Sequence, residues 1–498
     1  MDRHVIIIGS GLGGLTCGYI LAKNGYRVSL LEKNAQLGGC LYVFARNGAR
    51  FETGMHYIGS MEPGQNLHTF FNYLSLLPDV KLHPLDSMAY DVISLSGERF
   101  NFANGQEHFI ETLAQRFPGE RNNLQNYYRI METVADNSPL YRLRWNNALN
   151  LLNPDYIKRS ASDFIASTIN HPLLQQVVAG NVPLYAGVEG KTSFYIHAFI
   201  NHFYNQSACR IVGGSAAIAR SLVRSIRAMG GSVHASSPVA AIHCNQTQAV
   251  GVTLKNGEEI RGDYVISAIH PLRTIELLET PLIRKSYRDR ILNLKNTPSN
   301  FTVYIQFKKN KRPYLNSNFY HYNGNRVYGC ENYTPHDWPK GFLYMHHCPS
   351  ASPQYAETAV VLSYMNFEEV SRWKGTSVGR RGAGYEDFKR QKAERLLDDL
   401  EKQIPGTRAD IAQYYTSTPL TYLDYTGTEN GSMYGRLRDC SEPVQNVVSQ
   451  RTRIPNLFLT GQNTNSHGAL GVIIGAILTS GELLGVNTIV KQIIKDIS

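Results

Sequence analysis

A short strand followed at once by a glycine-rich turn does most to constrain the fold of this chain. Residues 5–8 are Val-Ile-Ile-Ile, a β-branched run that is too short for a helix and typical of a buried strand. Gly9, Gly11 and Gly14 follow with the spacing G-x-G-x-x-G. The first permits a tight turn, the second lets backbone approach a pyrophosphate, and the third lets the next helix pack closely on the strand. We therefore expect a helix N-terminus that faces phosphate groups.

An acidic residue completes this unit at the expected distance. A helix is expected over residues 12–24, and the apolar run at 27–31 predicts a second strand that ends directly before Glu32. A carboxylate at that position accepts hydrogen bonds from an adenosine ribose. Strand, glycine turn, helix, strand and acid in this order predict a Rossmann-like nucleotide site. Its candidate binding residues are Gly9, Ser10, Gly11, Leu12, Gly13, Gly14, Glu32 and Lys33.

A second glycine pair follows the acid. The chain reads Leu-Gly-Gly-Cys at 37–40 and Phe-Glu-Thr-Gly-Met-His-Tyr at 51–57. Here the sequence resembles the flavoprotein superfamily that contains amine oxidases, carotenoid desaturases and retinol saturases. In that superfamily the second glycine pair lies against the FAD pyrophosphate, and the Phe-acid-x-Gly segment runs beside the flavin. The resemblance implies FAD rather than NAD as the cofactor, and it adds Gly38, Gly39, Cys40, Met55 and His56 to the binding residues.

The end of the chain carries another strand, turn and helix. Residues 456–459 predict a buried strand, and a helix is expected from the region of residue 467 through 482. The resemblance implies that this segment closes the flavin site, with a positive helix end that stabilises the anion of reduced flavin. Many relatives carry an acid after the turn glycine, whereas this chain has Gln462 and Asn463. A buried strand and helix without a ligand is the alternative. The implied binding residues are Gly461, Gln462, Leu470, Gly471 and Val472.

The middle of the chain has a weaker nucleotide signal. An amphipathic helix is expected over residues 216–229. Short strands are expected at 238–242, 249–254 and 264–268, with a hairpin at Asn256-Gly257. From the residues alone this is only an α/β segment. The resemblance implies that it returns the chain to the FAD-binding domain, where the backbone at Val239 contacts the adenine end.

The three flavin-related segments predict the domain organisation. We expect an α/β fold with a discontinuous, Rossmann-like FAD-binding domain of the amine-oxidase type, formed by residues 1–75, 205–280 and 445–498. Residues 76–204 and 281–444 then form an inserted α+β substrate domain. The first inserted stretch is expected to be mostly helical, and the second to mix strands with one long helix. The expected elements are helices over 108–116, 121–136, 161–180 and 385–403, and strands over 301–307 and 358–365.

Composition and charge exclude several classes of protein. The 498 residues are 42% hydrophobic and 18% charged, as in a large soluble enzyme of two or three domains. The segment before the first strand is too short for a signal peptide, and no apolar run reaches about 18 residues, so we expect a cytoplasmic protein. Seven scattered cysteines predict neither a disulfide framework nor a metal site. The net charge of +10 comes without a nucleic-acid-binding motif, whereas a peripheral contact with an anionic membrane stays open.

Further segments narrow the resemblance to retinol saturases among the carotenoid-desaturase relatives. They are Gly-Gly-Cys at 38–40, Gly-Met-His-Tyr-Ile-Gly at 54–59, and segments 385–389, 418–421 and 431–435. Cys40 stands where amine oxidases usually carry an arginine. The resemblance implies a long apolar polyene or isoprenoid substrate, with saturation favoured over desaturation or isomerisation. The competing interpretations are an amine oxidase and a flavin-free escort of prenylated proteins, and the intact glycine fingerprint and acid disfavour the escort.

The expected chemistry needs a proton as well as a hydride. Flavins transfer hydride, and reduction of a carbon–carbon double bond adds a proton at the second carbon. His56 and Tyr57 follow the glycine of the flavin-adjacent segment and are candidate proton donors, although either can simply shape the cavity. No second G-x-G-x-x-G occurs, so no dedicated nicotinamide domain is expected. The electron donor or acceptor can be a quinone, a nicotinamide or a protein.

Overall fold

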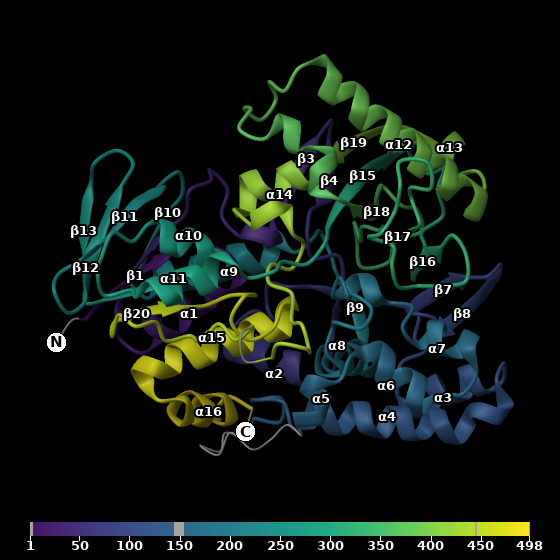
Figure 1. Cartoon of the computed structure of the whole chain (residues 1–498), viewed down its shortest axis with the longest axis horizontal. Coiled ribbons are helices and arrows are strands. Elements are labelled where there is room, and N and C mark those ends of the chain that lie inside the picture. Colours follow the sequence, from purple (N-terminus) through teal and green to yellow (C-terminus); the bar gives the residue numbers. More distant parts are fainter. Residues whose placement is uncertain (1–2, 144–153, 444–445, 498) are drawn as a thin grey trace.

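A parallel sheet forms one side of the molecule in the computed structural model, which describes residues 3–143, 154–443 and 446–497. Its strand order is β10-β2-β1-β14-β20, and all neighbouring strands are parallel (Figure 1). The central strand β1 is buried along its whole length, as expected where both faces of a sheet are covered. The strands are β1 (His4–Ile8), β2 (Arg27–Leu31), β10 (Ser232–His234), β14 (Tyr264–Ser267) and β20 (Leu457–Leu459).

Three helices pack beside one another against this sheet. Helix α1 (Leu12–Lys23) lies between α9 (Ala216–Ala228) and α15 (Gly468–Leu484) and contacts both. These helices come from the beginning, middle and end of the chain, so the first layer is assembled from three separated segments. A small antiparallel sheet of β11 (Val239–Cys244), β12 (Ala249–Leu254) and β13 (Glu259–Arg261) extends from it, with the hairpin expected at residues 256–257.

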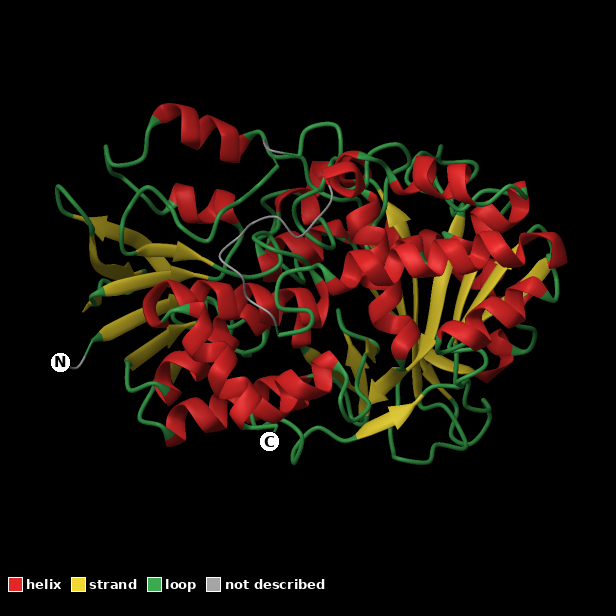
Figure 2. Ribbon diagram, turned by 90° about the horizontal axis from the view of Figure 1, so that it is seen from below, coloured by secondary structure: helices red, strands yellow, loops and turns green. Residues whose placement is uncertain are grey.

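The other half of the molecule is built on a seven-stranded sheet with the order β19-β15-β18-β17-β16-β7-β8. Figure 1 shows helix α12 (Ala383–Gln403) on one side of it and the helices α3, α4, α6, α7 and α8 on the other. Figure 2 shows the two sheets at opposite ends of the molecule, with helices and loops between them. The strands are β7 (Asp91–Leu95), β8 (Glu98–Phe102), β15 (Ser299–Phe307), β16 (Asn318–Tyr322), β17 (Gly341–His346), β18 (Thr358–Met365) and β19 (Ile411–Ser417).

The remaining elements connect or cover these layers. A hairpin of β3 (Val43–Arg46) and β4 (Ala49–Glu52) lies between the two halves, next to a small sheet of β5 (Ile58–Gly59), β6 (Leu82–Pro84) and β9 (Ala208–Ile211). The other helices are α2 (Asn66–Tyr73), α3 (Gln106–Ala114), α4 (Arg121–Asp136), α5 (Pro154–Lys158), α6 (Ala161–Thr168), α7 (Pro172–Val178), α8 (Phe194–Gln206), α10 (Pro271–Glu276), α11 (Lys285–Leu292), α13 (Thr407–Asp410), α14 (Pro419–Thr426) and α16 (Val486–Lys495).

The expected α/β class is confirmed, but one local prediction was wrong. The single helix expected over residues 161–180 is two helices, α6 and α7, because Pro172 starts a new helix and holds His171 in an extended conformation. The stretch 76–204 is mostly helical, as expected, but it also contains the hairpin of β7 and β8, which was not predicted. Strand β7 pairs in parallel with β16, so the second sheet joins strands from both inserted stretches. The exact domain boundaries stay a prediction.

Helix α15 is the most apolar helix near the end of the chain. Among the described residues, no single helix is long and apolar enough to cross a membrane. Helices α15 and α16 together meet that criterion by length and composition, with a bend of 118° between them.

Candidate active site

A cavity of about 780 Å³ runs from the carboxyl ends of the parallel strands to the second sheet. This is the edge of a parallel sheet at which α/β proteins bind ligands. Most of the predicted binding residues line it. They are Gly9, Gly11, Leu12, Gly13, Glu32, Lys33, Gly38, Gly39, Cys40, Met55, His56, Val239, Gly461, Gln462 and Val472. The four others, Ser10, Gly14, Leu470 and Gly471, are buried and do not line it.

The glycines of the first turn have distinct roles in this geometry. Gly9 has a φ of 99°, which favours glycine. Gly11 is the N-cap of α1 and makes no side-chain cap, and a Cβ there would meet no heavy atom within 4 Å. A Cβ on Gly14 would lie 2.1 Å from the carbonyl oxygen of Gly9, so this glycine lets helix and strand pack closely. The open space at Gly11, beside unsatisfied helix amides, is where a pyrophosphate fits.

Glu32 is held by its neighbours at the edge of the cavity. One oxygen, Oε2, accepts hydrogen bonds from the Ser10 amide at 2.9 Å and the Ser10 hydroxyl at 2.7 Å. The other, Oε1, accepts from the backbone and side chain of Asn34, each at 2.9 Å. Ser10 Oγ also accepts from the amide of Gly38 at 3.0 Å. Ser10 therefore does not face the cavity but ties the acid to the second glycine pair.

The segment that closes the site comes from the end of the chain. Gly461, after β20, packs so tightly on α1 that a Cβ on Gly13 would lie 2.9 Å from its Cα. Helix α15 then begins at the cavity without a side-chain N-cap, so its first amides face the open space. Gln462 lines the cavity in the position where an acid was expected from the resemblance, and its carbonyl accepts a hydrogen bond from Arg438 at 2.7 Å.

The far half of the cavity is apolar. Its wall is formed by side chains from the helical layer, the second sheet and the segment before β20: Leu184, Tyr204, Leu343, Met345, Leu362 and Met433. Sequence reasoning did not identify Leu184, Leu343, Met345 and Leu362, because they come from separated stretches without a common motif. Only segment 431–435, which was noted for its resemblance, pointed to Met433.

His56 and Tyr57 both line the cavity but differ in their surroundings. The Tyr57 hydroxyl donates to Asp91 Oδ2 at 3.2 Å and lies 2.7 Å from the Tyr320 hydroxyl, so it is engaged by the second sheet. Burial raises the pKa of Asp91 to about 7, and Asn318 donates to it at 2.9 Å. Burial, followed by the charges of His347 and Arg210, lowers the pKa of His56 to about 3. The imidazole is therefore neutral at physiological pH.

The residues present fit an FAD molecule. The open glycine edge at Gly11, the helix N-termini of α1 and α15, and the buried acid Glu32 match a dinucleotide at one end of the cavity. The acidic residues among the described lining are Glu32, Glu276 and Asp424, and they belong to this end. The other half of the cavity is lined by apolar side chains such as Leu343, Met345 and Leu362.

Comparison with known proteins agrees with this site. A family profile described as flavin containing amine oxidoreductase matches residues 12–482. The chain is 27% identical to an all-trans-retinol 13,14-reductase of Rattus norvegicus, over 96% of this chain and 85% of the relative. It is 25% identical to a 4,4'-diapophytoene desaturase of Methylomonas sp, over 62% of this chain and 61% of the relative. An oxidoreductase from Methanosarcina mazei has the same fold, with a TM-score of 0.66 and 15% identity. The match covers 95% of this chain and 99% of that structure.

The cofactor predicted from the second glycine pair is thereby confirmed as FAD, and the protein as an oxidoreductase. The residue-by-residue assignments of the binding site and the proton donor stay predictions. The profile spans nearly the whole chain, including the inserted stretches as well as the nucleotide-binding segments. The chain belongs to the family of flavin-containing amine oxidoreductases.

Proposed function

We propose that this protein is an FAD-dependent reductase that saturates a carbon–carbon double bond in a long apolar polyene, such as a retinoid. The observation that carries the proposal is the apolar half of the cavity, which lies next to the half that fits FAD. A pocket lined by Leu343, Met345 and Leu362 suits a hydrocarbon chain, because burial of apolar surface is its main source of affinity. The relatives named as a retinol reductase and a diapophytoene desaturase support a polyene substrate.

The position of the carboxylates in this cavity favours a neutral substrate over an amine. Simple aliphatic amines are cations at neutral pH, and the strongest partner for a cation in a buried site is a carboxylate. The lining acids among the described residues, Glu32, Glu276 and Asp424, are at the nucleotide end. Cys40 lines the cavity at the position where amine oxidases usually carry arginine.

In this reaction the residues of the chain orient the substrate, stabilise the flavin and supply a proton. When bound, reduced FAD supplies hydride to one carbon of the double bond. The apolar wall orients the polyene and excludes water, and the N-terminus of α15 presents a positive dipole end to the flavin site. His56 is the better placed of the two candidate donors, because the Tyr57 hydroxyl is already engaged by Asp91 and Tyr320. The electron donor, whether quinone, nicotinamide or protein, stays open, as does contact with a membrane surface.

Anaerobic reoxidation of the flavin tests this function. The flavin is photoreduced, and a retinoid, a carotenoid or a simple amine is mixed with the reduced or oxidised protein. We expect a polyene to reoxidise the reduced flavin and to gain two hydrogens, as measured by mass. Bleaching of the oxidised flavin by simple amines, with no response to any polyene, would identify an amine oxidase instead.

A further inference from the structure

A second, much smaller cavity of about 10 Å³ lies behind the apolar half of the large one. His56 and Met345 line both cavities, so these two side chains form the partition between them. The small cavity is also lined by Glu52 and His347. A space of this size holds about one water molecule, provided that polar groups are present to bind it.

Two neighbouring histidines line this cavity, and a ring nitrogen of the second, His347, has no hydrogen-bond partner. His346 has both ring nitrogens satisfied, because the Leu315 amide donates to Nδ1 at 2.9 Å and the Tyr344 hydroxyl lies 2.5 Å from Nε2. The neighbouring His347 is only 8% exposed, yet its Nε2 has no hydrogen-bond partner. Buried polar atoms are almost always satisfied by protein or by ordered water. The unpartnered nitrogen therefore indicates a water site in the small cavity.

Glu52 contributes a second polar group. Its side chain is buried, and Oε1 accepts a hydrogen bond from the amide of Ser215 at 2.9 Å. A Cβ on Gly214 would lie 3.1 Å from Glu52 Oε1 and also 3.1 Å from His347 Nε2, so the two atoms surround one point. Burial raises the pKa of Glu52 to about 8, against the opposing effects of the Ser215 amide and Arg210. The carboxyl group therefore carries a proton at neutral pH.

His56 cannot store a proton but can transmit one. Its neutral imidazole accepts a proton at one ring nitrogen while the other nitrogen donates. We propose that a water in the small cavity links Glu52 and His347 to His56, and that this chain delivers the proton which the reaction adds to carbon. The inference rests on the proposed reduction of a double bond. The other charged groups that act on this cluster are Arg50 and Arg210, and Cys348 is a further titratable neighbour.

The proton transfer balances with the hydride. The O–H bond of the Glu52 carboxyl breaks, and its proton passes to one nitrogen of His56 through the water, which His347 Nε2 holds in place. The other nitrogen releases its proton to the substrate carbon that neighbours the carbon receiving hydride from reduced flavin. The double bond thus gains one hydride and one proton. The Glu52 carboxylate recovers a proton from solvent before the next turnover.

Infrared spectroscopy of the flavin-free protein tests, independently of activity, whether the Glu52 carboxyl group is protonated at neutral pH. The difference spectrum between wild type and Glu52→Gln should contain the carbonyl band of a protonated carboxyl group at neutral pH. That band should disappear as the pH rises through about 8. Absence of the band at neutral pH would overturn the proposal, because Glu52 would then be ionised and hold no proton to deliver.

Single-turnover reoxidation of the photoreduced flavin by a polyene tests delivery. We expect Glu52→Gln and His347→Leu to bind flavin normally and to slow reoxidation by roughly 10²-fold or more, the usual contribution of a positioned acid. Glu52→Asp should recover part of the rate. The wild-type rate should fall as the pH rises through about 8, and the Glu52→Gln rate should not. An unchanged rate in Glu52→Gln would overturn the proposal while leaving the reductase function intact.

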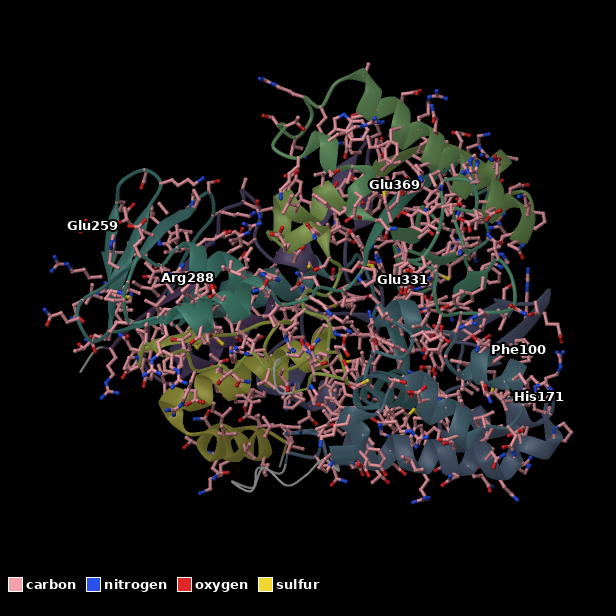
Figure 3. All side chains as sticks on the ribbon, in the orientation of Figure 1. Phe100, His171, Glu259, Arg288, Glu331 and Glu369 are labelled. Carbon is pink, nitrogen blue, oxygen red and sulfur yellow. The ribbon has the colours of Figure 1, made fainter. Side chains whose placement is uncertain are left out.

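A matched buried glutamate provides the control. Glu120 is 7% exposed, and its carboxylate likewise accepts a backbone hydrogen bond, from the His171 amide at 2.8 Å. It lies beside Phe100 and His171, which Figure 3 labels at the edge of the molecule, away from the large cavity. Glu120→Gln should leave the rate of reoxidation unchanged. If wild type reacts with no polyene, the proposed function fails, and the infrared band alone decides whether Glu52 stores a proton.

Discussion

Substitutions of two glycines in the same turn should have opposite effects. One should prevent FAD binding without changing stability, and the other should lower stability without preventing FAD binding. Gly11 has a φ of −60° and a ψ of 168°, which any residue adopts, and its Cβ would project into open space. We expect Gly11→Val to change the free energy of unfolding of the flavin-free protein by no more than about 1 kcal/mol. Because the valine side chain then occupies the space of the pyrophosphate, the variant should not bind FAD.

Gly14→Ala should do the reverse. The added methyl group would lie 2.1 Å from the Gly9 carbonyl oxygen and 3.0 Å from the Ala268 methyl group, so β1 and α1 must separate. Overpacking of this kind costs about 1–3 kcal/mol of folding free energy. The site itself is not filled, so any folded Gly14→Ala protein should still take up flavin.

Denaturant unfolding with and without FAD measures both effects. At a free FAD concentration of about 100 times Kd, binding stabilises the folded state by about 2.7 kcal/mol. Wild type should show this gain and Gly11→Val should show none, at nearly equal stability without flavin. Full flavin retention by Gly11→Val would refute the placement of the pyrophosphate. Wild-type stability of Gly14→Ala would refute the close contact between β1 and α1.

Three further substitutions test other parts of the site. Glu32→Ala removes the acceptor of the hydrogen bonds from Ser10, Asn34 and the ribose. The binding free energy of the flavin should therefore weaken by about 1–3 kcal/mol in a fluorescence titration. An unchanged affinity would contradict this role. Tyr57→Phe should lower the free energy of unfolding by about 1–3 kcal/mol, because buried Asp91 loses a hydrogen-bond donor. The rate of flavin reoxidation should stay within a few-fold of wild type. A large loss of rate would instead identify Tyr57 as the proton donor. Burial raises the pKa of Glu52 from 4.5 to about 8, so its stabilising effect is complete below pH 4.5 and is lost as the pH rises to about 8. Glu52→Gln should therefore gain roughly 5 kcal/mol relative to wild type across that range in pH-dependent unfolding, and a constant difference would contradict the raised pKa.

The nucleotide-binding half was predictable because its signals are local. The β-branched run before Gly9, the glycine spacing and the acid at Glu32 place β1, α1 and β2 within one residue of their observed bounds. Each of these signals acts over a few neighbouring residues, where strand propensity, turn geometry and helix packing agree.

Elements that depend on distant partners were not predictable in the same way. Strand β7 is short, and besides its hairpin partner β8 it pairs with β16, more than 200 positions later. The apolar half of the cavity is likewise assembled from separated stretches, so no spacing identifies Leu184 or Leu343. The relation between His56 and His347 depends on the approach of β17 to the flavin-adjacent segment, which the sequence pattern does not encode locally.

The central claim is that hydride passes from reduced FAD to a polyene, and one anaerobic measurement tests it most directly. The flavin is photoreduced, all-trans-retinol or a carotenoid is added, and the return of oxidised flavin absorbance is followed together with the mass of the product. The account predicts reoxidation at a rate that depends on the polyene concentration, with a product two hydrogens heavier than the substrate. Flavin that stays reduced with every polyene, but is readily formed from the oxidised state by amines, would contradict it.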